Sequence, residues 1–224
     1  HPDYYLKRLE TLLQENALQE DDQFRIRTMM QLLKPAFYLR LDDRKSDELE
    51  KMPGSRVLKD RNPMAGYRGI RMMLDNPRLL RLQLRALKRF IDTGRYRVRI
   101  FAPMVYEPEQ VRAMKQAMRE VGISEDVPAG MMAETPQSYE IRPFLSEIDF
   151  TSIGGNDQLQ LASVVSRTDA VQALLTLTNR QPALYRMLAT IANETARYNR
   201  EYRIPKGLKP ITNGYCGNWP SADP

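Results

Sequence analysis

Residues 97–134 read RVRIFAPMVYEPEQVRAMKQAMREVGISEDVPAGMMAE and contain a strand pattern, a helix pattern and a second strand pattern. Residues 97–105 alternate between polar and apolar side chains and then become apolar, as a strand does. Residues 108–121 begin at a proline, end before a glycine and repeat apolar side chains at helical spacing: Val111, Met114, Met118 and Val121. Residues 129–134 read as a short apolar strand. This order predicts a parallel β/α unit.

The same alternation continues on both sides of this unit. Further short apolar strand patterns lie at 37–41, 148–155 and 210–216. Further helical patterns lie at 5–34, 76–93, 137–147 and 181–200. Pro77 and Gly94 mark the two ends of the second of these helices, whereas Pro143 makes the third irregular. Residues 42–62 are polar and are predicted to form a long loop.

Alternating strands and helices predict an α/β fold in which helices cover a parallel sheet. The active site of such a fold gathers at the carboxyl ends of the strands. Polar or reactive side chains are expected at the ends of five successive predicted strands: Arg40, Arg99, Glu134, Asn156 with Asp157, and Cys216. Polar residues also occur wherever a strand meets a loop, so their position alone leaves a structural explanation open.

The composition indicates a globular chain with a sizeable core. Its 224 residues suit one domain, and 42% of them are hydrophobic and 28% charged. No apolar run approaches the ~20 residues of a membrane span. The first residues lack the apolar stretch of a signal peptide.

The counts of cysteine and histidine exclude several kinds of site. The chain has one cysteine, Cys216, and one histidine, His1. An internal disulfide framework, a multi-cysteine zinc site and a Ser-His-Asp triad inside the fold are therefore excluded. The chemistry must use carboxylates, arginines or the thiol.

The net charge of +6 suits an anionic partner, which could be a nucleic acid, a membrane surface or a small phosphate. Arginine grips phosphate and carboxylate groups through a planar fork. The arginines between 68 and 99 invite a nucleic-acid interpretation. Those at 78–89, however, alternate with a leucine stripe, as on the solvated face of a helix. We therefore expect neither a nucleic acid nor a membrane as the partner.

Glu134 and Asp157 follow adjacent predicted strands. Two carboxylates from neighbouring strand ends can share Mg²⁺ or Mn²⁺, with substrate oxygens and waters completing the octahedron. The alternative is a pair of solvated acids or helix caps. The residues alone leave both interpretations open.

Two glycine-containing stretches could approach an anion. NPMAGYRGIR (62–71) places Arg68 and Arg71 beside glycines that permit close backbone approach. SIGGND (152–157) has a glycine pair at a strand end, and the alternative for both stretches is a tight turn. Cys216, in NGYCGN, could transfer a proton, although a buried inert cysteine is the commoner case.

Five motifs, in order, relate the chain to a known family: NPMAGYRGIR, RIFAPMV, GMMAETP, SIGGNDQLQL followed by SR, and GYCG. From about residue 20 onward the chain resembles the phosphoenolpyruvate/pyruvate-binding barrel of the phosphoenolpyruvate-utilising enzymes. These are phosphoenolpyruvate synthase, pyruvate phosphate dikinase and enzyme I of the sugar phosphotransferase system. The resemblance implies a (β/α)8 TIM-type barrel that is incomplete here, with about five of eight strands, in a single domain over 1–224.

The resemblance implies Mg²⁺-dependent phosphoryl transfer between phosphoenolpyruvate or pyruvate and a phosphohistidine carried on another domain. By the same resemblance, Arg40 and Arg68 would hold the phosphoryl group and Arg99 would lie near the enolate oxygen. Glu134 and Asp157 would bind Mg²⁺, with Mn²⁺ as an alternative. This division of roles is chemically reasonable, because a metal stabilises an enolate and arginines neutralise the phosphoryl oxygens.

The resemblance also assigns roles to three further residues. Asn156 and Arg167 would orient the substrate, and Cys216 would transfer a proton to or from its methyl or methylene carbon. It implies a cytoplasmic homodimer that is part of a longer multidomain enzyme, most similar to phosphoenolpyruvate synthase (pyruvate, water dikinase). The alternatives are an enzyme I or dikinase-type phosphotransferase and a non-catalytic, shortened barrel that acts as a binding module. The final phosphoryl acceptor stays open between water, phosphate and a carrier protein.

Overall fold

A computed structural model gives one sheet of five parallel strands, which lie side by side in the order of the sequence. The structure describes residues 36–54, 60–163 and 182–216, with a few single positions before residue 24. The strands are β1 (Ala36–Arg40), β2 (Arg97–Ala102), β3 (Ala129–Ala133), β4 (Phe150–Gly154) and β5 (Thr212–Cys216). All five predicted strands are confirmed.

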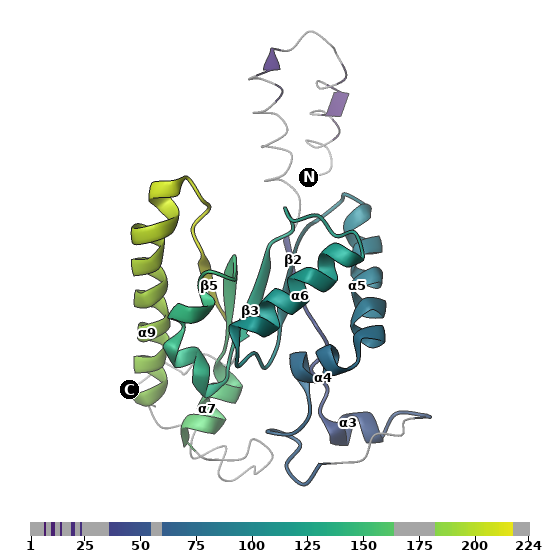
Figure 1. The fold of residues 1–224 in the computed structure, drawn as a ribbon, viewed down its shortest axis with the longest axis vertical. Helices are drawn as coiled ribbons and strands as arrows, with labels where there is room; N and C mark the ends of the chain where they lie inside the picture. Colours follow the sequence, from purple (N-terminus) through teal and green to yellow (C-terminus); the bar gives the residue numbers. More distant parts are fainter. Residues whose placement is uncertain are drawn as a thin grey trace.

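The longest helices lie along one face of this sheet (Figure 1). They are α5 (Pro77–Asp92), α6 (Pro108–Glu120) and α9 (Pro182–Tyr198). Shorter helices are α3 (Ser46–Glu50), α4 (Gly69–Asp75) and α7 (Gly155–Ser163). The remaining turns are the 3-10 helices η1 (Pro136–Glu140), η2 (Arg142–Phe144) and η4 (Ile204–Lys206), and the π-helix η3 (Asn199–Arg203).

The structure confirms most of the predicted helices. Those at 76–93, 108–121 and 181–200 correspond to α5, α6 and α9, and the irregular segment at 137–147 is two short 3-10 helices. The prediction of a continuous loop over 42–62 is wrong, because α3 lies within it. The predicted helix at 5–34 lies almost entirely outside the described residues.

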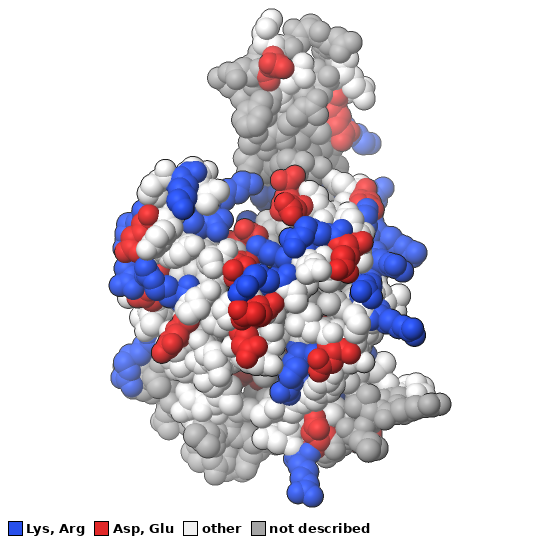
Figure 2. Space-filling model, viewed as in Figure 1, with Lys and Arg blue, Asp and Glu red and all other residues white. Residues whose placement is uncertain are grey.

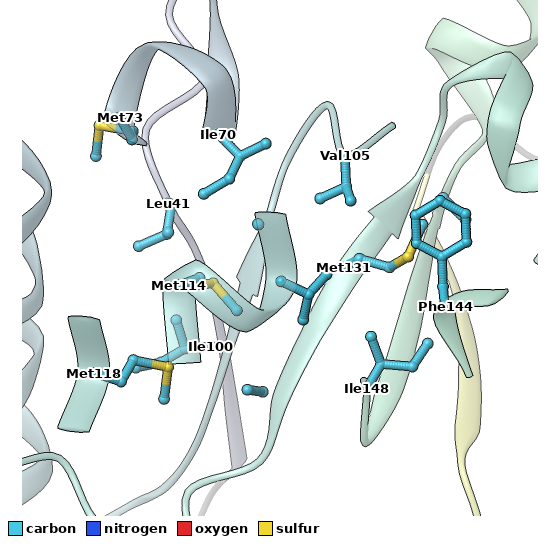
Figure 3. Packing of buried hydrophobic residues seen from close by; sticks show 14 of the residues in the cluster. Leu41, Ile70, Met73, Ile100, Val105, Met114, Met118, Met131, Phe144 and Ile148 are labelled. Carbon is cyan, nitrogen blue, oxygen red and sulfur yellow. The ribbon is translucent and has the colours of Figure 1, made fainter. Parts of the chain in front are cut away.

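The main core lies between the sheet and the helices that cover it. Figure 3 shows Ile100 of β2 close to Met114 and Met118 of α6, whereas Met131 of β3 lies beside Phe144 and Ile148. All of these residues are buried, because alternate strand residues point to the helical layer while the apolar stripe of α6 points back. This packing fixes the carboxyl ends of neighbouring strands relative to one another.

The opposite face of the sheet carries a second, smaller buried cluster of Phe101, Met132 and Phe150. Phe101 of β2 and Phe150 of β4 both pair with Gly130 of β3, and Met132 lies two residues further along β3 on the same face. Among the described strands, β1 and β5 are the edges, so the sheet curls without closing. The fold is therefore an α/β half-barrel with five strands of the (β/α)8 type, as expected.

The charged surface of the molecule is mixed. On the face shown in Figure 2, acidic and basic side chains alternate, and the blue side chains project most at the edge where α5 lies. Arg78, Arg85 and Arg89 of α5 are exposed, and Arg81 is paired with Glu120 at 3.5 Å. These arginines cover a solvated helix face, as the leucine stripe predicts. No helix among the described residues is long and apolar enough to cross a membrane.

Candidate functional site

The carboxyl ends of the strands bring most of the predicted site residues to one edge of the sheet. Arg40 ends β1 and Glu134 directly follows β3. Asn156 and Asp157 lie in the first turn of α7, immediately after β4. Cys216 ends β5 and pairs in register with Gly154.

Arg99 does not lie at a strand end, so that part of the prediction is wrong. It is the third residue of β2 and pairs with Tyr38, about 10 Å before the end of the strand at the usual rise per residue. Its guanidinium lies over the rings of Tyr38 and Phe150, at 5.3 and 5.5 Å from their centroids. The motif RIFAPM correctly predicts a strand, but it does not predict the position of Arg99 along that strand.

Arg68 is held in a buried, two-pronged ion pair with Asp43. Its Nε donates to Asp43 Oδ1 at 3.0 Å and its Nη2 to Asp43 Oδ2 at 2.6 Å. A third donor, Nη1, reaches the carbonyl of Met64 at 3.2 Å. Only 5% of Arg68 and 3% of the Asp43 side chain are exposed. Such fork-to-fork pairs fix the plane of the guanidinium.

This geometry leaves part of Arg68 available for a ligand. A guanidinium has five N–H donors, and three of them are used within the protein. Nη2 also lies 3.9 Å from Asp157 Oδ2. Arg40, with 45% of its side chain exposed, contacts the same Asp43 Oδ2 through Nη1 at 3.2 Å. One carboxylate therefore orients both arginines.

Glu134 is buried beside this group, and one of its two carboxylate oxygens has no protein partner. Oε1 accepts the backbone N–H of Met104 at 2.7 Å. Oε2 is buried and has no hydrogen bond in the structure. A Cβ added at Gly154 would lie 2.7 Å from Oε2. Glycine on β4 is thus what allows the carboxylate to lie against the strand.

Burial, together with the neighbouring carboxyl groups of Asp157 and Asp43, raises the pKa of Glu134 from 4.5 to about 8, although the hydrogen bond from the Met104 N–H acts to lower it. A buried carboxyl group with a raised pKa lacks a nearby positive charge that would stabilise its ionised form. A hard divalent cation would bind such an unpartnered, buried oxygen together with the second carboxylate. The residues present therefore fit Mg²⁺ or Mn²⁺.

The protein supplies two carboxylates to such a cation rather than a full set of ligands. Within the described residues, no group of three or more His, Cys, Asp or Glu side chains could hold a metal ion. Mg²⁺ commonly keeps several waters and is bound through one or two carboxylates together with substrate oxygens. The Glu134–Asp157 pair matches that pattern.

Two cavities share Arg68 and Asp157 in their walls. One, of about 660 Å³, is lined by the charged loop after β1, including Arg40, Asp43 and Arg44. The other, of about 310 Å³, is lined by Met104, Gln137 and Leu161, among others. The wall of the first cavity has four basic and four acidic side chains, whereas the second offers more apolar surface.

The first cavity contains residues that the sequence analysis did not select. Asp43 organises the arginines, and Arg44 forms an ion pair with Asp42. Burial acts to raise the pKa of Asp42, but the hydrogen bonds and charge of Arg44 outweigh it and hold the pKa below its usual value. The pair of acids after the strand FYLRL was the available signal.

Asn156 is partly buried at the start of α7, next to Asp157. For Cys216 the structure gives the strand position alone, and Arg167 lies outside the described residues. Gln158, which was not predicted, is fully buried and donates from Nε2 to the carbonyl of Ala133 at 2.6 Å. It ties the first turn of α7 to the end of β3.

Comparison with known proteins shows the family to which the chain belongs. Residues 6–224 match the family described as "PEP-utilising enzyme, PEP-binding domain". The chain belongs to the PEP-utilising enzymes. The strand-end residues described above therefore lie in a PEP-binding domain of this family.

Two kinds of relative in this family are similar to the chain. Phosphoenolpyruvate synthase of Pyrococcus furiosus is 35% identical over 176 residues, which are 76% of this chain and 21% of that protein. The phosphoenolpyruvate-dependent phosphotransferase system protein of Escherichia coli is 30% identical over 213 residues, which are 89% of this chain and 28% of that protein. The chain thus spans about a fifth of the first relative and just over a quarter of the second.

Proposed function

We propose that this PEP-utilising domain carries out the phosphoryl transfer between phosphoenolpyruvate or pyruvate and a phosphohistidine supplied by another domain, with Mg²⁺ bound at Glu134 and Asp157. The chain would act within a longer, homodimeric, cytoplasmic enzyme of the phosphoenolpyruvate synthase type. The observation that carries the proposal is the uncompensated negative charge at the carboxyl edge of the sheet, directly beside two oriented arginines.

The charge balance of the buried group favours a divalent cation. Asp43, Glu134 and Asp157 are three buried carboxyl groups, and Arg68 is the one buried cation among them. With all three ionised, the buried groups carry a net charge of −2, and the half-exposed Arg40, which pairs with Asp43, reduces the uncompensated charge to −1. Buried charges are tolerated when they are paired or coordinate a metal, so a divalent cation would compensate the remaining negative charge.

The arginines beside this group suit a phosphoryl ligand. Arg68 keeps unused N–H donors, and Arg40 is half exposed to the larger cavity. Asp43 holds both guanidinium groups, so they need little reorganisation when the ligand binds. Preorganised donors aimed at the phosphoryl oxygens are the main protein contribution to phosphoryl transfer.

The remaining roles are those that the resemblance of the sequence to the family implies. Mg²⁺, when bound, would supply a Lewis acid that favours the enolate form of pyruvate. In the direction of pyruvate formation, the phosphorus–oxygen bond of phosphoenolpyruvate breaks, a bond to the histidine nitrogen forms, and the enolate carbon takes up a proton. Cys216, at the end of β5, is proposed to provide that proton, and Asn156 and Arg167 to orient the substrate.

A thermal-shift experiment tests the proposal. Melting temperature is measured for the chain alone, with Mg²⁺, with phosphoenolpyruvate and with both. Ligand at about 100 times Kd stabilises by about 2.7 kcal/mol, which for a domain of this size is a rise of about 5 to 10 °C. The rise should require both components together.

Two variants make the test specific. Arg68→Ala should abolish the ligand-dependent rise in melting temperature. The rise is measured against the ligand-free melting temperature of the same variant, because the loss of the buried Arg68–Asp43 ion pair itself changes stability. Arg85→Ala removes an exposed arginine of α5 and should keep the full rise. If the wild-type chain is well folded and its melting temperature does not change with either ligand, the result would instead favour a non-catalytic binding module.

A second readout separates binding from proton transfer. In D2O with Mg²⁺, exchange of the pyruvate methyl protons is followed by NMR. Cys216→Ala should slow this exchange strongly while leaving the thermal shift in place. Unchanged exchange in that variant would exclude the thiol as the proton donor.

A further inference from the structure

Met104 has a strained backbone conformation directly beside the site. Its φ is 55°, and among the described residues it is the one non-glycine residue with a positive φ. This left-handed region is unusual for a residue with a bulky side chain and persists where the surroundings over-determine it. The local structure should therefore contain contacts that hold Met104 in place.

The turn at Pro103–Val105 is held by one long-range hydrogen bond at each of its three residues. The carbonyl of Pro103 accepts the N–H of Ile70 at 3.1 Å. The N–H of Met104 reaches Glu134 Oε1 at 2.7 Å, and the carbonyl of Val105 accepts the Thr135 hydroxyl at 2.7 Å. The turn after β2 is thus bonded to both the start of α4 and the end of β3.

Gly69 forms the matching surface for this turn. It is buried, and its own φ is +64°. A Cβ at this position would lie 2.7 Å from Met104 Cβ, 3.0 Å from Met104 Cγ and 3.0 Å from the carbonyl oxygen of Pro103. No side chain at residue 69 is compatible with the observed position of Met104.

From this geometry we infer that Gly69 and Met104 form a backbone clasp that positions Glu134 for a cation. Met104, in its left-handed conformation, directs its N–H to Glu134 Oε1 and leaves Oε2 for the metal. Gly69 provides the space in which that conformation exists. The inference rests on the proposed function for its cation and assigns both residues a positioning role.

The clasp also couples the carboxylate to the arginine of the site. Gly69 directly follows Arg68, the residue at the amino-terminal cap of α4. A side chain at residue 69 that displaces Met104 would therefore disturb both Glu134, which would bind the metal, and Arg68, which would bind the phosphoryl group. Groups that orient metal ligands commonly change metal affinity by about 10- to 100-fold when they are altered.

The chain offers a closely matched control for Gly69→Ala. Gly94 has a φ of +65°, and a Cβ there would meet nothing within 4 Å. Both substitutions place an alanine in the same left-handed conformation, but only the Cβ of Gly69→Ala would clash with Met104. The difference in behaviour between the two variants therefore reports the contact between residues 69 and 104.

Mn²⁺ titration of the full chain, followed by the electron paramagnetic resonance signal of free Mn²⁺, gives the first readout. Gly69→Ala should raise Kd for Mn²⁺ at least 10-fold, whereas Gly94→Ala should stay within 2-fold of the wild-type value. Hydrogen exchange of the Met104 amide, measured by NMR on the metal-free chain, gives the second. It should accelerate at least 10-fold in Gly69→Ala and not in Gly94→Ala.

The two readouts separate failure of the clasp from failure of the proposed function. Unchanged Met104 exchange in Gly69→Ala would overturn the clasp. A wild-type chain that protects this amide but binds no Mn²⁺ would overturn the metal site, and with it the cation part of the inference. If Gly69→Ala does not fold, Met104→Ala replaces it: alanine keeps the amide and the strain of a Cβ at this φ but lacks the rest of the side chain that packs against Gly69. Wild-type exchange and Mn²⁺ affinity in Met104→Ala would overturn the inference.

Discussion

Replacing Glu134 with glutamine should change how the stability of the metal-free chain depends on pH. The buried carboxyl group has a pKa of about 8 in the folded chain, against an ordinary value of 4.5. Between these two values the folded chain holds a proton that the unfolded chain has released. Unfolding therefore releases a proton, and the free energy of unfolding falls as the pH rises through this window.

The size of the effect follows from the difference between the two pKa values. Each pH unit inside the window corresponds to about 1.4 kcal/mol, so Glu134 should lower the free energy of unfolding by on the order of 4 kcal/mol between about pH 5 and pH 8. That is a large part of the 5–15 kcal/mol typical of a domain. Glutamine has the same shape, can still accept the Met104 N–H and does not titrate.

Urea unfolding at a series of pH values measures the difference directly. The stability of the wild-type chain relative to Glu134→Gln should decline steadily from about pH 5 to pH 8 and then level off. The side chain of Glu125 is 77% exposed, so the free energy of unfolding of Glu125→Gln should depend on pH in the same way as that of the wild type. A difference between wild type and Glu134→Gln that stays constant with pH would refute the raised pKa, because no proton would then be linked to folding at this site.

Further predictions concern packing around the site and in the core. Gly154→Ala should weaken Mn²⁺ binding at least 10-fold and destabilise the chain by about 1–3 kcal/mol, because its Cβ would meet Glu134 Cβ and Oε2 at 2.7 Å. Gly214→Ala, whose nearest contact would be at 3.9 Å, is its control in the same titration and in urea unfolding. Leu84→Ala, at a fully buried position of α5, should lower the free energy of unfolding by about 2–5 kcal/mol, whereas Leu82→Ala, 66% exposed, should change it little; equal effects would contradict the packing described for α5.

The strands and long helices could be predicted because their signals are local. Residues 129–133 are all buried and therefore read as an unbroken apolar run. Pro108 begins α6 and Gly122, with a φ of +81°, follows its end. The short helices α3 and α4 have five and seven residues, too few for an apolar period to repeat, and they were missed for that reason.

The site residues could be selected in part, because parallel strands bring their carboxyl ends together whatever their separation in sequence. Glu134 and Asp157 were found in this way. The pairing of Arg68 with Asp43 could not be predicted, since it joins positions 25 residues apart in the sequence that no strand or helix pattern relates to each other. Arg99 was misplaced because alternation along a strand gives the face of a residue but not its distance from the end.

The geometry of the edge of the sheet connects these observations to the proposed chemistry. Glu134 is buried against a glycine of β4, so its charge is poorly solvated, and the clasp at Met104 satisfies only one of its oxygens. The group can relieve this state by taking up a proton or by binding a cation, and the two processes compete for the same oxygen. Cation affinity should therefore rise with pH until about pH 8, while Asp43 keeps the arginines in place in either state. A site built in this way would be ready for a phosphorylated ligand only when the metal has replaced the proton.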